Sequence, residues 1–161
     1  MSVQQRSIVV PVTGGTGDER VLDLLGRLLQ QTSTSITLVY VLEVVQSISL
    51  DAELPEAVSR GEEVLDQAER YARGELGKNI RLSNVTTEIL QARAAGAAIV
   101  DEAFERQADA IVMSSAVRTI HGRATIGETA DYVLKNSPCE VILVREPLEF
   151  PTRSLRSVAA G

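Results

Sequence analysis

Apolar residues along the chain gather in five short runs, and these runs are separated by segments with helical periodicity. The runs have strand length and are rich in β-branched residues. They are SIVVPV (residues 7–12), ITLVYVLEVV (36–45), NVTTEILQA (84–92), ADAIVMSS (108–115) and CEVILVRE (139–146). The first two are continuously apolar, which is typical of strands buried on both faces. The third alternates polar and apolar residues, so it predicts an edge or half-exposed strand.

Between the runs, apolar positions recur at intervals of three and four, the spacing of one helix face. This pattern predicts helices over residues 18–31, 56–76, 95–107 and 126–136. The segment TGGTGDE after the first strand predicts a tight turn, with Asp18 as a capping residue at the start of the first helix.

Strands and helices alternate, and each helix has the length of a crossover connection. The predicted fold class is therefore a doubly wound α/β domain, an open parallel sheet with helices on both faces. A chain of 161 residues is long enough for one such domain. We expect it to occupy residues 1–146, followed by a tail over residues 147–161 that is either a loose terminus or an arm laid on a partner.

Composition restricts the possible partners. The net charge of −6 argues against nucleic-acid binding, which rewards a basic surface. Cys139 is the only cysteine and no leader-like segment is present, so we expect a cytoplasmic setting. No apolar run approaches the roughly 20 residues that cross a bilayer. His121 has no Cys, Asp and Glu neighbours at metal-ligand spacing, so we expect no metal.

Ligands of open α/β sheets bind beyond the carboxyl ends of the strands, where the strand order reverses. The loops after the first and fourth predicted strands, residues 13–17 and 114–124, are therefore the candidate site. The glycines at positions 14, 15 and 17 would let backbone N–H groups approach a ligand. The same glycines would equally satisfy a tight strand-to-helix turn without any ligand.

Several of these segments resemble the universal stress protein family over residues 5–146. They are IVVPVTGG, LVYVLE, ADAIVMSS and GETADYVLKNSPCEVILVRE, of which SPCEVILVR is the most specific part. The resemblance implies a five-stranded parallel sheet in the order 3-2-1-4-5, Rossmann-like and similar to adenine nucleotide alpha hydrolases. It also implies a homodimer formed through the last strand. Some members of the family bind ATP or related nucleotides, and others do not.

The nucleotide-binding members carry Gly-x-x-Gly, nine residues, then Gly followed by Ser or Thr, and an Asp two residues after the first-strand proline. The matching residues here are Ser114, Val117, Gly127, Glu128 and Thr13, so only Gly127 is kept. Glu128 would place a negative charge where phosphate oxygens lie. Two unit charges about 4 Å apart interact by roughly 4 kcal/mol at an effective dielectric of about 20, against about 0.3–1 kcal/mol from a helix dipole. The nucleotide site is therefore expected to be weakened or lost.

Two further features of this loop admit different interpretations. Residues 125–128 have the spacing of a capping box, in which the helix satisfies its own N–H groups without phosphate. Arg118, His121 and Arg123 could draw in an anion and partly neutralise Glu128, or they could form a solvated basic loop. The candidate pocket for ATP, AMP or another anion comprises Pro11, Thr13, Val41, Met113, Ser114, Val117, Gly127 and Glu128, together with Arg118 and Arg123.

Catalysis is not expected, because the sequence contains no G-x-S-x-G, G-x-x-x-x-G-K-[ST] or H-E-x-x-H motif. Ser114 and Ser115 near His121 could act as nucleophile and base in phosphoanhydride hydrolysis, but serines at a strand end usually form turns. Cys139 enters a buried strand and is expected to pack rather than react.

The last apolar run would lie at one edge of the predicted sheet, where it could pair with another chain. The first functional hypothesis is thus a cytoplasmic homodimer, joined through residues 140–146, that regulates or interacts with a protein partner. The alternative is a sensor that binds a nucleotide or another anion in the candidate pocket.

Overall fold

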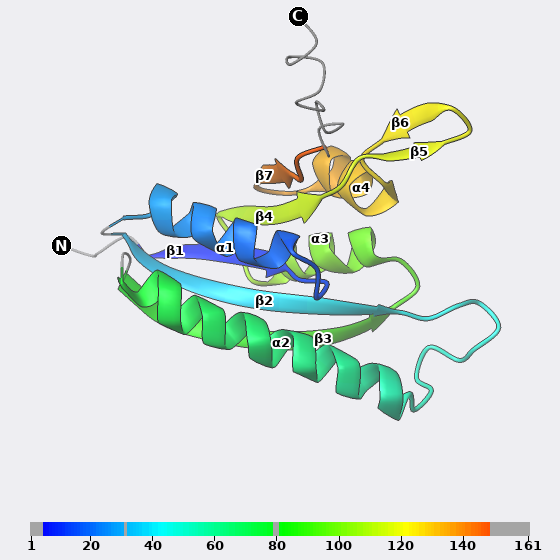
Figure 1. Ribbon diagram of the computed structural model, residues 1–161. Helices are drawn as coiled ribbons and strands as arrows, with labels where there is room; N and C mark the ends of the chain where they lie inside the picture. Colours follow the sequence, from blue (N-terminus) through cyan, green and yellow to red (C-terminus); the bar gives the residue numbers. More distant parts are fainter. Residues whose placement is uncertain (1–4, 31, 79–80, 149–161) are drawn as a thin grey trace, which may run out of the picture.

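The structure is a computed structural model that describes residues 5–30, 32–78 and 81–148 (Figure 1). The main-sheet strands are β1 (Arg6–Pro11), β2 (Ser33–Glu43), β3 (Arg81–Ala92), β4 (Ala110–Ser115) and β7 (Glu140–Arg145). The helices are α1 (Gly17–Leu28), α2 (Pro55–Glu75), α3 (Ala95–Glu105) and α4 (Glu128–Asn136), with a short 3-10 turn, η1 (Leu76–Lys78). Strands β5 (Arg118–Ile120) and β6 (Arg123–Thr125) form a separate hairpin.

The main sheet is parallel throughout and has the order β3-β2-β1-β4-β7. Counted along the chain, this is the order 3-2-1-4-5, so the predicted fold class and strand order are confirmed. The order reverses between β1 and β4. The loops after these two strands therefore meet at the same edge of the sheet, where an α/β fold usually binds its ligand.

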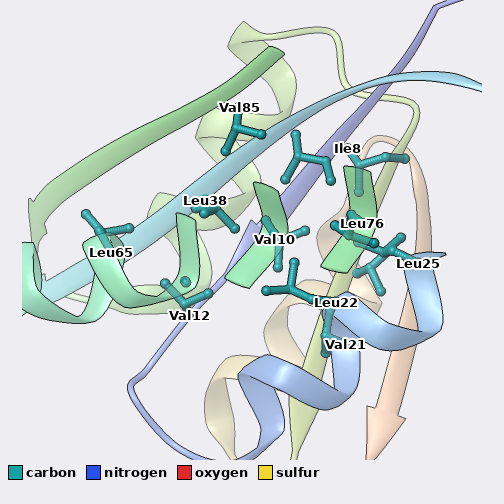
Figure 2. Packing of buried hydrophobic residues seen from close by; sticks show 14 of the residues in the cluster. Ile8, Val10, Val12, Val21, Leu22, Leu25, Leu38, Leu65, Leu76 and Val85 are labelled. Carbon is teal, nitrogen blue, oxygen red and sulfur yellow. The ribbon is translucent and has the colours of Figure 1, made fainter. Parts of the chain in front are cut away.

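Two apolar clusters bury both faces of the sheet. On one face Ile8 and Val10 of β1 pack with Leu22 of α1 and Leu65 of α2 (Figure 2). On the other face Val9 packs in a cluster with residues of α3 and α4. Burying one such side chain contributes about 1.5–3 kcal/mol. The continuously apolar first strand is explained by this two-sided burial.

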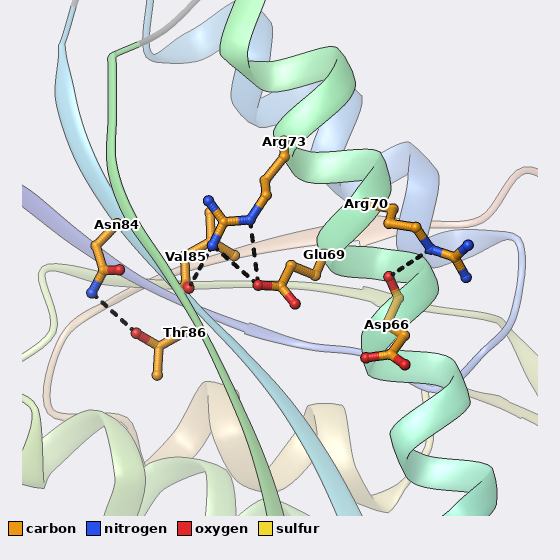
Figure 3. Close-up of polar contacts among 7 residues, drawn as sticks. All are labelled: Asp66, Glu69, Arg70, Arg73, Asn84, Val85 and Thr86. Atoms are coloured by element: carbon orange, nitrogen blue, oxygen red, sulfur yellow. Dashed lines mark hydrogen bonds and ion pairs between the residues drawn. The ribbon is translucent and has the colours of Figure 1, made fainter.

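Polar contacts fasten the edge strand β3 to the helices. Arg73 of α2 donates to Glu69 Oε1 at 3.1 Å and to the carbonyl oxygen of Val85 at 3.4 Å (Figure 3). On the opposite face, Arg106 at the end of α3 forms an ion pair with Glu88 of β3 at 2.7 Å. The alternating run thus forms an edge strand, as predicted, and it is connected to α2 through the Val85 carbonyl and to Arg106 at the end of α3 through the Glu88 side chain.

Some boundaries differ from those expected. Strand β2 begins at Ser33, before the apolar run, because the polar residues Ser33 to Ser35 already pair with β3. The last helix begins at Glu128 instead of residue 126. The hairpin was not predicted, and residues 149–161 of the predicted tail lie outside the described residues. Within the described part of the chain, no helix is both long and apolar enough to cross a membrane.

Gly61 of α2 packs directly on the ring of Tyr40 in β2. A Cβ added at Gly61 would lie 2.7 Å from Tyr40 Cδ1. Alanine favours a helix over glycine by about 1 kcal/mol, but overpacking costs about 1–3 kcal/mol. We therefore expect Gly61→Ala to lower the free energy of unfolding by about 1 kcal/mol in urea titrations.

Gly74 is the matched control in the same helix, because an added Cβ there meets no atom within 4 Å. Gly74→Ala is expected to raise the free energy of unfolding by about 0.5–1 kcal/mol. Equal effects of the two substitutions would contradict the close packing of α2 on β2.

Candidate functional site

The loop after β1 is closed by a side chain from the first turn of α1. The Asp18 carboxylate accepts hydrogen bonds from the backbone N–H of Thr13 at 3.1 and 3.3 Å and from that of Gly14 at 2.7 Å. Asp18 is buried, with 8% of its surface exposed. The predicted capping role of Asp18 is wrong, because Thr16 is the N-cap and Asp18 turns back into the loop. Amides that could have faced an anion are thus bound to a carboxylate of the chain itself.

The surroundings of Asp18 are negative. Burial raises the pKa of the Asp18 carboxyl, and the carboxylates of Glu146 and Glu19 raise it further. The hydrogen bonds from Thr13 and Gly14 lower the pKa without cancelling the rise. An additional phosphate here would meet the same desolvation and the same repulsion.

The start of α1 packs tightly on β4 and on the residue that follows β7. A Cβ added at Gly17 would overlap Ser114 Oγ and would lie 2.7 Å from Glu146 Oε1. The backbone N–H of Glu146 donates to the Ser115 carbonyl at 2.8 Å and so extends the pairing of β7 with β4. Glycine is needed at position 17, because Ser114 and Glu146 occupy the space that a Cβ at the start of α1 would need.

The loop after β4 folds into the β5–β6 hairpin, which projects from the domain beyond the end of β4 (Figure 1). His121 and Gly122 form the turn, with φ values of 51° and 74°. Two successive positive φ values fit a type I′ turn, whose twist matches that of a hairpin. The sequence signal was the His-Gly pair between two short strand-forming segments, and it is weak because His is not the usual residue there.

The strand register places the basic residues on one side of the hairpin. Arg118 pairs with Thr125, and Ile120 pairs with Arg123. Directly paired residues share a face and alternate residues along a strand share a face, so Arg118, Ile120 and Arg123 lie on the same side. None of the ion pairs in the described part of the chain includes Arg118, Arg123 or Glu128. These arginines therefore form no direct ion pair with Glu128 in the described part of the chain.

The start of α4 differs from the predicted capping box. Gly127 is the N-cap, and its N–H donates to Thr125 Oγ1 at 3.1 Å. Ser115 Oγ donates to the carbonyl of Ile126 and holds the base of the hairpin. The capping-box prediction is wrong, because Thr125 belongs to β6 and cannot also begin α4. Glu128 is exposed in the first turn of α4.

The other predicted pocket residues are divided between the sheet and the hairpin. Pro11 and Thr13 lie at the end of β1, and Val41 lies near the end of β2. Met113 is buried in β4. Val117 is half-buried between β4 and β5, whereas both arginines and His121 are exposed on the hairpin. The predicted sheet residues thus lie at the carboxyl edge, whereas the basic residues lie on the projecting hairpin.

A cavity of about 190 Å³ lies between the β1 loop, where Gly14 and Gly15 line it, and helices α1 and α2. Its lining includes Asp18, Glu19, Leu22, Val64 and Tyr71. The Tyr71 hydroxyl donates to Asp23 Oδ1 at 2.6 Å, and this bond raises the pKa of Tyr71 to about 12. Sequence reasoning pointed to the loop that lines one side of this cavity but missed the other walls, because they come from two helices that are distant in the chain. Its carboxylates do not suit a phosphate.

The remaining candidates are structural. Cys139 is half-buried and packs against the α3 and α4 cluster, as expected. Arg93 donates to the carbonyl oxygens of Val44 at 3.2 Å and Ile48 at 2.8 Å, and so fixes the loop after β2. Among the described residues, no group of three His, Cys, Asp or Glu side chains is placed to hold a metal ion.

Nearly the whole described chain matches a known protein family. The model of the universal stress protein family matches residues 5–145. The chain belongs to the universal stress protein family. A universal stress protein of Methanocaldococcus jannaschii is 28% identical over 148 residues, which cover 88% of this chain and 83% of that protein.

Solved universal stress proteins share the fold at low sequence identity. The protein from Archaeoglobus fulgidus gives a TM-score of 0.65 at 23% identity, covering 86% of this chain and 97% of that one. A structure of the universal stress protein from the same organism in complex with dAMP gives 0.63 at 21% identity, with coverages of 88% and 98%. A family protein of Arabidopsis thaliana with AMP bound gives 0.60 at 14% identity, with coverages of 92% and 97%. The fold of this universal stress protein is therefore one that binds adenine nucleotides in other chains.

The raised pKa of Asp18 predicts a pH dependence of stability. The folded chain holds the Asp18 proton more tightly than the unfolded chain does. The contribution of Asp18 is therefore most favourable at low pH and is lost as the pH rises through the raised pKa. We expect the free energy of unfolding of the wild type, minus that of Asp18→Asn, to fall as the pH rises above about 4 in urea titrations.

Glu62→Gln is the control, because it removes one negative charge from an exposed position of α2. A difference between the wild type and Asp18→Asn that grows with pH would mean that the amide hydrogen bonds outweigh burial at Asp18.

Proposed function

We propose that this universal stress protein is a dimeric, cytoplasmic protein that regulates a partner protein in a stress response, without catalysis and with its ATP site lost. The observation that carries the proposal is the Asp18 carboxylate bound to the amides of Thr13 and Gly14. This contact gives the β1 loop an internal anion in place of a ligand. A family member that does not respond to nucleotide would act by binding a partner protein on its surface.

The loop after β4 supports the same proposal. Its residues fold into a hairpin, and the carboxylate of Glu128 stands at the start of α4. A phosphate about 4 Å from that carboxylate would be repelled by roughly 4 kcal/mol at an effective dielectric of about 20. A helix terminus contributes about 0.3–1 kcal/mol in return, so the repulsion dominates.

We therefore expect ATP, AMP and cyclic AMP to produce no saturable heat in calorimetry and no shift in melting temperature. A nucleotide present at a concentration of about a hundred times its dissociation constant would stabilise the fold by about 2.7 kcal/mol, which a thermal melt readily detects. The triple variant Ser114→Gly, Val117→Gly, Glu128→Ser removes two side chains from the loop and the negative charge of Glu128. We expect this variant to gain affinity for nucleotide. A saturable shift of the wild type would contradict the loss of the site.

The anion-sensor alternative is favoured by one observation, the placement of Arg118 and Arg123 on the same side of the hairpin. Diagonal neighbours in a hairpin are about 7–8 Å apart, so two long side chains can reach one anion. If the wild type does respond to nucleotides, loss of the response in Arg118→Ala, Arg123→Ala would identify this second function.

The dimer is proposed to form through β7, the outer strand next to β4. Val141→Lys would place a charge in the middle of that contact and is expected to give the mass of one chain in light scattering. Circular dichroism would check that the variant is folded. Thr87→Lys, at an exposed position of β3 on the opposite edge, is the control and should keep the mass of two chains. A Val141→Lys variant that is still dimeric would exclude this interface.

A further inference from the structure

A cluster of three charged side chains joins the outer strand β3 to helix α3. Glu88 comes from β3, Glu102 from the last turn of α3, and Arg106 from the residue that ends this helix. Arg106 Nη2 lies 2.7 Å from Glu88 Oε1, and Arg106 Nε donates to Glu102 Oε1 at 2.5 Å. One guanidinium therefore holds two carboxyl groups that belong to different elements.

The geometry of the guanidinium brings these two carboxyl groups together. The N–H groups of Nε and Nη2 form one side of a rigid planar fork, which matches the two oxygens of a single carboxylate. In this structure each nitrogen of the fork meets a different carboxyl group, so the two accepting oxygens lie side by side. Glu88 and Glu102 are close enough to hydrogen-bond to each other. Two carboxylates that share one site repel each other strongly when both are ionised.

The second oxygen of Glu88 indicates how this repulsion is relieved. Glu88 Oε2 is buried, and no donor in the described part of the chain forms a hydrogen bond to it. A buried oxygen without a donor is costly, above all when it carries a negative charge. A proton on this oxygen would turn it into a donor, and the adjacent Glu102 carboxylate would accept the hydrogen bond.

We infer that Glu88 and Glu102 share one proton beside Arg106, so that β3 is held to α3 most tightly while the pair carries a single negative charge. The cluster is then neutral overall, whereas loss of the proton leaves two carboxylates on one guanidinium. Glu102 cannot leave easily, because only 9% of its side chain is exposed. The Glu88 side chain is 32% exposed and can turn into the solvent, which breaks its ion pair with Arg106. The cluster is thus a pH-sensitive link at the edge of the sheet.

The pKa values of the two carboxyl groups are shifted in opposite directions, as a shared proton requires. The hydrogen bond to Glu102 raises the pKa of Glu88, and burial raises it further, against the lowering effect of Arg106. Burial acts to raise the pKa of Glu102, but the hydrogen bonds to Glu88 and Arg106 outweigh it and lower this pKa.

The elements packed around the pair place their other charged side chains elsewhere. On the neighbouring strand β2, the apolar Val39 lies beside Glu88. The charged residue of β2, Glu43, accepts a hydrogen bond from the N–H of Ala95 at 2.9 Å, at the opposite end of α3. The remaining charged side chains of α3 and α4 are exposed, namely Asp101, Glu105, Glu128, Asp131 and Lys135.

The directions of the two shifts define a pH window. Because the pKa of Glu88 is raised, its contribution to stability is present at low pH and is lost as the pH rises through the raised value. Because the pKa of Glu102 is lowered, its contribution is present at higher pH and is lost as the pH falls through the lowered value. The link is therefore tightest between the two values, which lie on either side of about 4.3.

Carbon-13 NMR of the side-chain carboxyl groups would detect the shared proton. We expect the pair in the wild type to titrate in two steps, one below and one above about pH 4.3. In Glu102→Gln, Glu88 has no carboxylate beside it and keeps Arg106, so it should titrate at or below about pH 4.3. A wild type in which both carboxyl groups titrate below that pH, as two independent partners of Arg106 would, overturns the inference.

Hydrogen exchange would measure how tightly β3 is held. As the pH rises through the upper step, we expect the protection factors of the β3 amides that pair with β2 to fall. Linkage gives about a tenfold fall for each pH unit between that step and about pH 4.3. Glu88→Gln carries an amide that donates to Glu102 and accepts from Arg106 at any pH, so its protection should stay constant. Glu105→Gln is the matched control, because it removes an exposed charge from α3, and it should follow the wild type.

The two measurements separate the proton from its effect on the fold. If Glu88→Gln lost protection with rising pH as the wild type does, another group would be responsible and the inference would be wrong. Two titration steps with constant protection in the wild type would refute the pH-sensitive link. The wild-type titration needs no variant, so it tests the shared proton even if a substitution prevents folding, which circular dichroism would reveal.

Discussion

The burial of both faces of β1 determines where the rest of the chain can carry function. Ile8 and Val10 belong to one cluster and Val9 to the other, so neither face of this strand can meet a ligand. Helices then cover both faces of the sheet. The accessible regions include the carboxyl edge, with its loops, and the outer edge of β7. The proposed loss of nucleotide binding and the proposed dimer concern these two regions because the packing leaves them free.

At the carboxyl edge, the chain itself supplies a hydrogen-bond acceptor for the backbone amides of the β1 loop. A glycine-rich loop exposes amides that need an acceptor, and a bound anion is one means of providing it. Here Asp18 provides it from within the chain, at 2.7 Å from the Gly14 nitrogen. Internal satisfaction has an electrostatic consequence, because Asp18, Glu19 and Glu146 together make the loop negative. Asp18 therefore both closes the loop and adds to its negative charge.

The strands and helices could be predicted from the sequence, because helices show apolar residues at intervals of three and four and strands buried on both faces are continuously apolar. The strand order came from a family resemblance, and the family match and the sheet itself confirm it. The role of Asp18 could not be read, since an acidic residue in a first helical turn equally fits a cap. The hairpin was missed because strands of three residues are too short for periodicity to detect. The carboxylates that surround Asp18 come from α1 and from the end of β7, and only folding brings them together.

The hairpin is joined to the domain at its base, where Ser115 contacts Ile126, and its paired residues are exposed or nearly so. Its sequence is therefore decoupled from the packing of the sheet. Insertions, deletions and substitutions can change the length and charge of the hairpin while the hydrophobic clusters stay intact. Replacement of this one loop can thus change the surface of the protein beside the carboxyl edge while the core stays the same.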